Sequence, residues 1–161
     1  MRFLIGTVLC LGATLLAVSR NAARASDPLT ATLSNYQLGC GGCHGFDGVS
    51  NSKLVPTLKG LVGFYLNTAD GRDYLPRLPN VAFSTMSDQE LAAVLNYAVF
   101  EIGGSSAPIG ARPYDASEVG RLRKRPLTEV PLHLYRREIV DALIADFHAS
   151  EALRIYQIGI Y

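Results

Sequence analysis

Cys40-Gly41-Gly42-Cys43-His44 is the stretch that decides how this 161-residue chain folds. Two cysteines separated by two residues and followed by histidine form the attachment sequence of c-type haem. The two thiols can form thioether bonds to the vinyl groups of one porphyrin, and the imidazole can bind its iron. Because positions i, i+3 and i+4 share one face of a helix, all three side chains can reach the same group. The motif predicts one covalently bound haem c, with its iron.

Other uses of a Cys-x-x-Cys pair fit this sequence less well. A structural zinc site needs four ligands, but no cysteine follows Cys43, and His133 and His148 lie far downstream, fifteen residues apart. A thioredoxin-like redox pair belongs to a βαβ pattern, and none is visible around the motif. Haem attachment is therefore the favoured interpretation.

The N-terminal segment has the pattern of an export signal. Met1-Arg2 is followed by the apolar run 3–18, and Ala23-Arg24-Ala25 has the small-x-small spacing of a cleavage site. The apolar run has sixteen residues, whereas a membrane span needs about 20. We expect residues 1–25 to be a signal peptide cut after Ala25, with an uncleaved membrane anchor as the alternative. Export predicts the periplasm, where haem is attached to proteins of this type.

The charge balance excludes a strongly basic protein. The whole chain has 15 Lys and Arg, 14 Asp and Glu, and a formal charge of +1. Three of the basic residues lie in the predicted signal peptide, so the mature chain is slightly acidic. This balance argues against nucleic acid or an anionic membrane surface as the main partner.

Helix signals lie on both sides of the motif. Asp27-Pro28 has the residue types of an N-cap and a first helical position, and predicts a helix leading into Cys40. Its expected apolar face is Leu29, Leu33, Tyr36 and Leu38. Ser87 and Glu90 form a capping box that predicts a helix to about Ile102, ended by Gly103-Gly104.

The segment between these helices contains the other candidate haem contacts. The carbonyl of Pro56 can accept a hydrogen bond from the ring N–H of His44, as a ligand imidazole requires, although Pro56 also suits a plain turn. We expect a short helix over 61–66 and a turn over 68–72. Pro76 and Pro79 predict an irregular apolar loop over 74–83 that forms a wall of the haem crevice. Arg72 and Arg77 are candidates to pair with the haem propionates, or are solvated surface charges.

The residues after Gly104 predict a further helical region. A Pro- and Gly-containing linker leads to a second cap, Asp115 with Glu118, and an amphipathic helix is expected over 132–147. A basic patch, expected to be solvated or to dock an acidic redox partner, consists of Arg121, Arg123, Lys124 and Arg125. The apolar tail should pack on the core or meet a partner. The predicted organisation is a signal peptide (1–25), a haem domain (26–104), and a linker with a C-terminal helical extension (105–161).

Residues 28–103 resemble the class I monohaem cytochromes c. The resemblance rests on Tyr36 before the motif, Asp47-Gly48 after it, Pro56-x-Leu58-x-Gly60, and the capped helix SDQELAAVLNYAVF (87–100). It implies an all-α fold around one covalent haem, in which the first and last core helices cross. It also implies that His44 is the proximal ligand, that Pro56 accepts the His44 N–H, and that Tyr97 packs on the first helix.

The sequence departs from this family at the distal ligand. The family usually has a Met-Pro pair where this chain has Leu78-Pro79, and leucine cannot bind iron. Met86 is the remaining methionine of the mature chain, and it also suits a hydrophobic staple with Leu91. The distal ligand could be Met86, His133 or His148, or the sixth position could be open.

The expected function is outer-sphere electron transfer rather than enzyme catalysis. The protein would take single electrons from a periplasmic dehydrogenase, as its subunit or as a separate protein, and pass them to a downstream cytochrome or oxidase. The alternative is a haem-based binder or sensor of small ligands, or a peroxidase-like protein, with an open sixth site. A peroxidase needs a distal acid–base residue, and none is placed for this role over 74–86.

Overall fold

The computed structural model describes residues 27–52, 54–129, 131–147 and 149–157, and these residues form helices and loops without any strand. The all-α prediction is therefore confirmed. The predicted signal peptide lies outside the described residues, and none of the described helices is long and apolar enough to span a bilayer.

In chain order the elements, with η for 3₁₀ and π segments, are α1 (Pro28–Tyr36), η1 (Gln37–Gly41), α2 (Gly42–His44), η2 (Val62–Asn67), α3 (Ala69–Arg77), α4 (Pro79–Ala82), α5 (Asp88–Asn96), η3 (Tyr97–Ile102), η4 (Gly104–Ser106), α6 (Ala116–Arg123), α7 (Leu132–Phe147) and η5 (Glu151–Gln157).

The first helical run carries the Cys-x-x-Cys-His motif. It continues from α1 through η1 into α2 and ends at Gly45, whose φ of 81° suits glycine. Tyr36 is fully buried, but Leu29 and Leu38 are 58% and 87% exposed. The predicted apolar face is therefore wrong at both leucines. At Leu38 the reason is the π segment, which turns the residues after Tyr36 away from the face set by α1.

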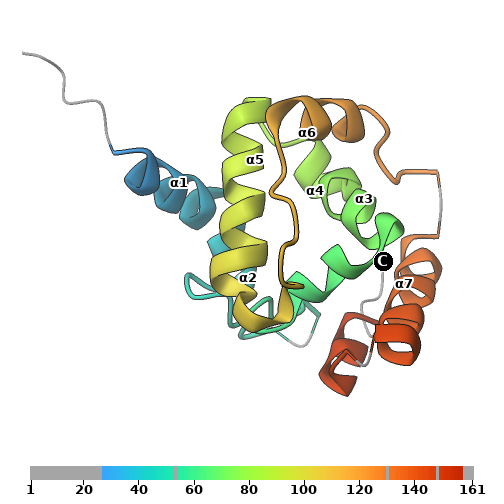
Figure 1. Cartoon of the computed structure of the whole chain (residues 1–161). Helices are drawn as coiled ribbons and strands as arrows, with labels where there is room; N and C mark the ends of the chain where they lie inside the picture. Colours follow the sequence, from blue (N-terminus) through green and yellow to red (C-terminus); the bar gives the residue numbers. More distant parts are fainter. Residues whose placement is uncertain (1–26, 53, 130, 148, 158–161) are drawn as a thin grey trace, which may run out of the picture.

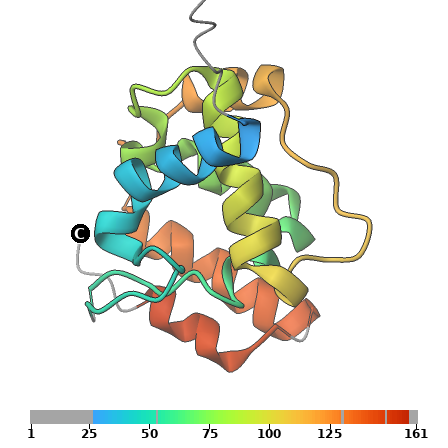
Figure 2. The same cartoon turned by 90° about the vertical axis from the view of Figure 1, so that its left-hand side faces the viewer.

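The second helical run crosses the first. Both capping-box bonds are present between Ser87 and Glu90, and the run continues from α5 through η3 to Ile102. Figure 2 shows α1 lying across α5. The rings of Tyr36 and Tyr97 meet edge to face, with centroids 5.3 Å apart. The predicted helix and the predicted packing of Tyr97 are confirmed.

The segment over 68–83 is more regular than predicted. Thr68 caps α3 by accepting a hydrogen bond from the Gly71 amide, and α3 passes through Pro76. A proline inside a helix leaves the carbonyl four residues earlier without its amide donor. Here that carbonyl, of Arg72, accepts a 2.7 Å hydrogen bond from the Tyr114 hydroxyl. The irregular loop predicted from two prolines is therefore wrong, because a side chain from a distant segment replaces the missing donor.

The C-terminal segment packs against the same core. Helix α7 has the predicted bounds, and Asp115 caps α6 through the Glu118 amide. One cluster of buried side chains contains Leu91 of α5 together with Val119, Val140 and Leu153 from α6, α7 and η5. Figure 1 shows these three elements around the α3–α4 region, with the linker before α6 running beside α5. Residues after 104, which lie beyond the haem domain (26–104) that the sequence predicts, therefore contribute to the core.

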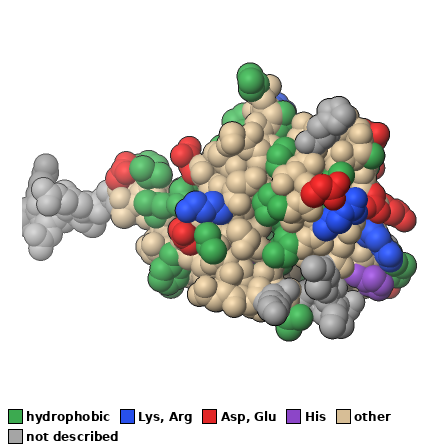
Figure 3. Space-filling model, turned by 90° about the horizontal axis from the view of Figure 1, so that it is seen from below, with side chains coloured by type: hydrophobic (Ala, Val, Ile, Leu, Met, Phe, Trp, Pro, Cys, Tyr) green, Lys and Arg blue, Asp and Glu red, His purple; other side chains and the backbone are tan. Residues whose placement is uncertain are grey.

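The predicted basic patch is only partly exposed. Arg121, Lys124 and Arg125 lie on the surface. The Arg123 side chain is 14% exposed and bonds to the chain before α5. The opposite face of the molecule, seen from below in Figure 3, has basic and acidic side chains next to one another rather than a field of one sign.

A buried ion pair joins α3 to α6. Arg72 donates from Nε and Nη2 to the two carboxylate oxygens of Glu118, at 2.7 and 2.8 Å. It also bonds to the carbonyls of Arg112 and Pro113, and its guanidinium lies 4.3 Å from the centre of the Tyr114 ring. The hydrogen bond from Arg72 holds the pKa of Glu118 below its ordinary value of 4.5, against the opposing effect of burial. Arg72 therefore links α3 to α6.

Glu118→Gln should lower the free energy of unfolding by roughly 1.5–3 kcal/mol near pH 7, because a charged hydrogen-bonded pair is lost. Since the pKa of Glu118 is depressed in the folded protein, this contribution is present above pH 4.5, the ordinary value. It is lost as the pH falls through the folded-state pKa. Urea unfolding of the wild type and the variant should therefore converge in acid.

The matched control is Glu101→Gln, the same change at an exposed glutamate of η3. It should shift stability by less than about 0.5 kcal/mol. An equal loss in both variants, or a Glu118→Gln effect that persists unchanged in acid, would contradict the role given to this ion pair.

Candidate haem-binding site

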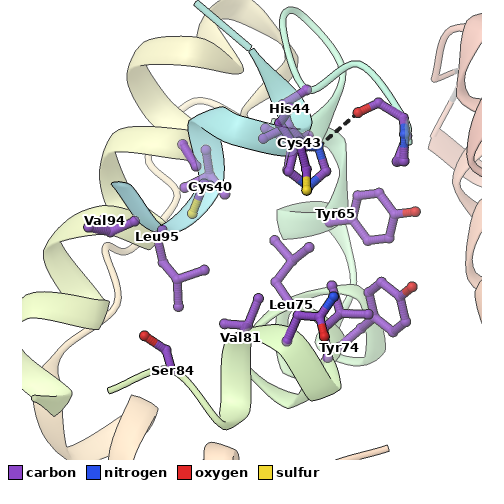
Figure 4. Close-up of a pocket in the computed structure, with 18 of the residues that line it drawn as sticks. Cys40, Cys43, His44, Tyr65, Tyr74, Leu75, Val81, Ser84, Val94 and Leu95 are labelled. Carbon is purple, nitrogen blue, oxygen red and sulfur yellow. Dashed lines mark hydrogen bonds between the residues drawn. The ribbon is translucent and has the colours of Figure 1, made fainter. Parts of the chain in front are cut away.

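Cys40, Cys43 and His44 line one mainly apolar cavity of about 430 Å³. This volume lies within the range of roughly 300–1,000 Å³ typical of pockets for small organic ligands. The walls come from the first helical run, the Pro56 loop, η2, α3, α4, α5, α7 and η5. Figure 4 shows the two cysteines and His44 at one end, and Tyr65 and Tyr74 farther along the pocket.

The two cysteines are reduced thiols on the same side of the pocket. Cys43 is exposed and Cys40 is partly buried. Burial, and to a lesser extent the neighbouring Cys43, raises the pKa of the Cys40 thiol. Gly41 keeps the turn compact, because a Cβ there would lie 2.6 Å from the Phe46 ring. The helical turn thus presents both thiols and the imidazole to one cavity.

The His44 ring is held by the Pro56 loop. Its Nδ1 lies 3.0 Å from the Pro56 carbonyl oxygen. A carbonyl can only accept, so the bond requires the proton on Nδ1 and leaves the Nε2 lone pair available to a metal. Burial lowers the pKa of His44, while the bond to Pro56 opposes this shift. The neutral, ligand-competent imidazole is favoured.

Thr57, the residue after Pro56, is held by two hydrogen bonds from different segments. The Thr57 hydroxyl accepts a hydrogen bond from the Ser50 amide, at 3.2 Å. The Thr57 carbonyl accepts one from the Tyr156 hydroxyl, at 2.8 Å. The tail segment η5 therefore supports the backbone that binds His44.

Met86 lies in the pocket lining, as do Leu78 and Pro79. Its side chain is partly buried and packs against the core cluster that contains Leu91. Its methyl carbon approaches Gly39 so closely that a Cβ there would be 2.6 Å away. Met86 is thus positioned to face the cavity and to pack as a staple.

Arg123 fixes the segment that carries Met86. Its guanidinium donates to the carbonyls of Ala82 at 2.9 Å and Met86 at 2.8 Å, and to that of Ser84. It also pairs with Asp88 at 3.2 Å. An arginine from α6 therefore clamps the chain immediately before α5.

The structure does not bring Arg72 and Arg77 into the pocket lining. Arg72 binds Glu118, and Arg77 Nε donates to the Arg125 carbonyl at 2.8 Å. Among the proposed alternative ligands, His133 is exposed on α7 and is not a lining residue, and His148 lies outside the described residues. The described residues contain no group of three His, Cys, Asp or Glu that could hold a metal ion.

The structure adds pocket residues that sequence reasoning missed. They are Tyr65, Tyr74, Arg136 and Tyr156, and all four are buried. One signal was available for Arg136, because it lies four residues after Leu132 and four before Val140, on the apolar stripe of α7. A charged residue on such a stripe predicts a buried partner for its charge.

The donor set fits a covalently attached haem. Two thiols with Cys-x-x-Cys spacing, an imidazole with its proton fixed on Nδ1, and an apolar cavity are the features that a c-type haem requires. Met86 supplies a thioether within the same lining. The residues present therefore accommodate the group predicted from the sequence.

Comparison with known proteins agrees with this geometry. No family model matches the chain. The chain is 29% identical over 118 residues to a protein named cytochrome c-552 from Thermus thermophilus, covering 62% of this chain and 90% of that relative. A second cytochrome c-552, from a particular strain of the same organism, is also 29% identical over 118 residues, with coverage of 62% and 80%. Together with the motif and the helical fold, this similarity supports the resemblance to the class I monohaem cytochromes c.

Proposed function

We propose that this chain is a periplasmic monohaem cytochrome c that carries single electrons and is not itself an enzyme. The observation that supports this most is the shared pocket of Cys40, Cys43 and His44, with His44 Nδ1 bonded to the Pro56 carbonyl. When bound, the haem supplies an iron that changes between ferrous and ferric states and so accepts and releases one electron.

The chain's own contribution is attachment, orientation and exclusion of water. Cys40 and Cys43 would hold the haem edge through thioether bonds, and His44 Nε2 would be the proximal ligand. Burial favours the neutral imidazole, and the Pro56 carbonyl orients it. The apolar lining leaves little solvent around the iron, which stabilises a defined redox site.

Met86 is our candidate for the distal ligand. It lines the pocket, and Arg123 holds its backbone carbonyl at 2.8 Å. Such a clamp would keep the thioether in place as the charge on the iron changes. His/Met ligation raises the reduction potential and closes the iron to small ligands, as suits an electron carrier.

Exposed side chains in and near the attachment segment support a role in transient contact with redox proteins. Cys43 is exposed, and Leu38, Phe46 and Leu54 of the surrounding segments are 87%, 68% and 54% exposed. Exposed apolar side chains close to the attachment motif in the chain would give a partner protein a surface to contact. The donor that we propose is a periplasmic dehydrogenase, and the acceptor a downstream cytochrome or oxidase. Residues 1–25 would serve as the export signal, and 105–161 as an extension packed on the haem domain.

Haem attachment is tested by intact mass. After expression in a bacterium that attaches haem c, the mature chain should exceed the apoprotein mass by one haem. Reductive titration should consume one electron per chain. Cys40→Ala combined with Cys43→Ala should abolish both results, because no thioether can form.

Cys10→Ala is the matched control, since Cys10 lies in the segment expected to be removed. It should leave the mass, the spectrum and the electron count of the mature protein unchanged. A wild-type protein without bound haem, or a double variant that still carries covalent haem, would refute the attachment.

The role of Met86 is tested by Met86→Leu, which retains an apolar staple and removes the sulfur. If Met86 binds iron, the ferric protein should lose the weak red absorption of the Met–iron pair, and the reduction potential should fall. Arg123→Met retains Met86 but removes its clamp, and should weaken the same absorption. An unchanged ferric spectrum in Met86→Leu would show that the residue is only a staple.

A further inference from the structure

We propose that Arg136, Tyr65 and Tyr74 form the binding site for the haem carboxylates, at the end of the pocket opposite Cys40 and Cys43. This inference rests on the proposed haem binding. It assigns a ligand-binding role to the C-terminal extension, which holds Arg136 in α7.

Arg136 is a buried cation without an acidic partner among the described residues. It is 6% exposed. Arg72 and Arg123, whose side chains are 15% and 14% exposed, pair with Glu118 and Asp88. Arg136 Nε instead donates to the Tyr74 hydroxyl at 2.7 Å, and Nη1 donates to the Tyr156 carbonyl at 3.0 Å. These neutral acceptors leave its charge uncompensated, and a buried charge is costly unless it is paired.

The two tyrosines add hydrogen-bond donors to this cation. Tyr65 is fully buried, and its hydroxyl has no hydrogen-bond partner among the described residues. The Tyr74 hydroxyl accepts from Arg136, so its own proton remains available for donation. Burial raises the pKa of both phenols, which therefore stay protonated. A buried donor without an acceptor is unfavourable, so this cluster calls for an anion.

The position of the cluster matches the shape of haem. The Tyr65 and Tyr74 rings are stacked, with centroids 5.5 Å apart. Figure 4 shows both hydroxyls pointing away from Cys40 and Cys43. In haem, the two propionates lie on the edge of the ring opposite the vinyl groups. A porphyrin joined to the cysteines through its vinyl groups would therefore direct its carboxylates toward this cluster.

The pocket lining favours the haem carboxylates, rather than a different anion, as the ligand of this cluster. Arg136, Tyr65 and Tyr74 line the same cavity as Cys40 and His44. Tyr156 joins the two ends, because its carbonyl accepts from Arg136 while its hydroxyl donates to Thr57, next to Pro56. The C-terminal segment would thus hold the haem carboxylates and support the loop that binds His44.

The test uses haem-loaded protein and the propionate bending mode in the resonance Raman spectrum of its ferrous form. The frequency of this mode follows hydrogen bonding to the haem carboxylates. Arg136→Met and Tyr65→Phe should each shift the mode to lower frequency, and Arg136→Lys should restore part of the Arg136→Met shift. Arg136→Met should also lower the reduction potential, because a positive charge near the haem favours the ferrous state.

Arg137→Met is the matched control, since Arg137 is the exposed neighbour on the same helix. It should leave the propionate mode unchanged. If Arg136→Met does not fold, Tyr65→Phe decides, because it removes only one oxygen. An unchanged propionate mode in haem-loaded Tyr65→Phe would overturn this assignment alone, whereas wild-type protein without covalent haem would overturn the proposed function and with it this site.

Discussion

The hydrogen bond between His44 Nδ1 and the Pro56 carbonyl is the interaction on which the site depends. It joins the end of the first helical run to a loop twelve residues later, at 3.0 Å. The helical turn sets His44 and both cysteines on one side of the pocket, and the carbonyl then fixes the proton on Nδ1. Gly45 ends the run with a positive φ, and the Tyr36 hydroxyl donates to its carbonyl at 3.0 Å. One short segment therefore holds the two thiols and the imidazole together and, with Pro56, fixes the tautomer of His44.

The C-terminal segment completes the walls around that turn. Arg123 of α6 clamps the chain that carries Met86, and Tyr156 of η5 anchors the residue after Pro56. Arg136 of α7 lies in the same cavity. These contacts reach both the proximal side and the proposed distal side of the pocket. In our account the extension is part of the haem environment, and its removal would disturb the pocket as well as the stability of the fold.

Local signals predicted much of this structure. The Cys-x-x-Cys-His spacing, the capping box at Ser87 and the amphipathic stripe over 132–147 each depend on residues close together in the chain. Each led to an element or a pocket that the structure contains. The crossing of the two core helices followed from the family resemblance, through Tyr36 and Tyr97.

The predictions from the sequence are wrong where a segment far along the chain makes the contact that determines the local structure. Pro76 is tolerated in α3 because Tyr114, 42 residues from Arg72, bonds to the Arg72 carbonyl. The sequence makes Arg72 a candidate for the propionates, but Glu118, 46 residues away, binds it. The sequence places Arg123 in a basic surface patch, yet its side chain is largely buried and bonds to the Met86 carbonyl and to Asp88. Charge and propensity in one segment do not reveal such partners, because tertiary contacts override local preference.

The central claim is that the chain closes both faces of one haem, so that the iron exchanges electrons and not ligands. Adding carbon monoxide to the ferrous protein tests this most directly. Our account predicts that the visible spectrum stays that of a six-coordinate haem, because His44 and the proposed second ligand Met86 would both bind the iron. An immediate change to the spectrum of a carbon monoxide complex would contradict it and would favour a ligand-binding haem protein.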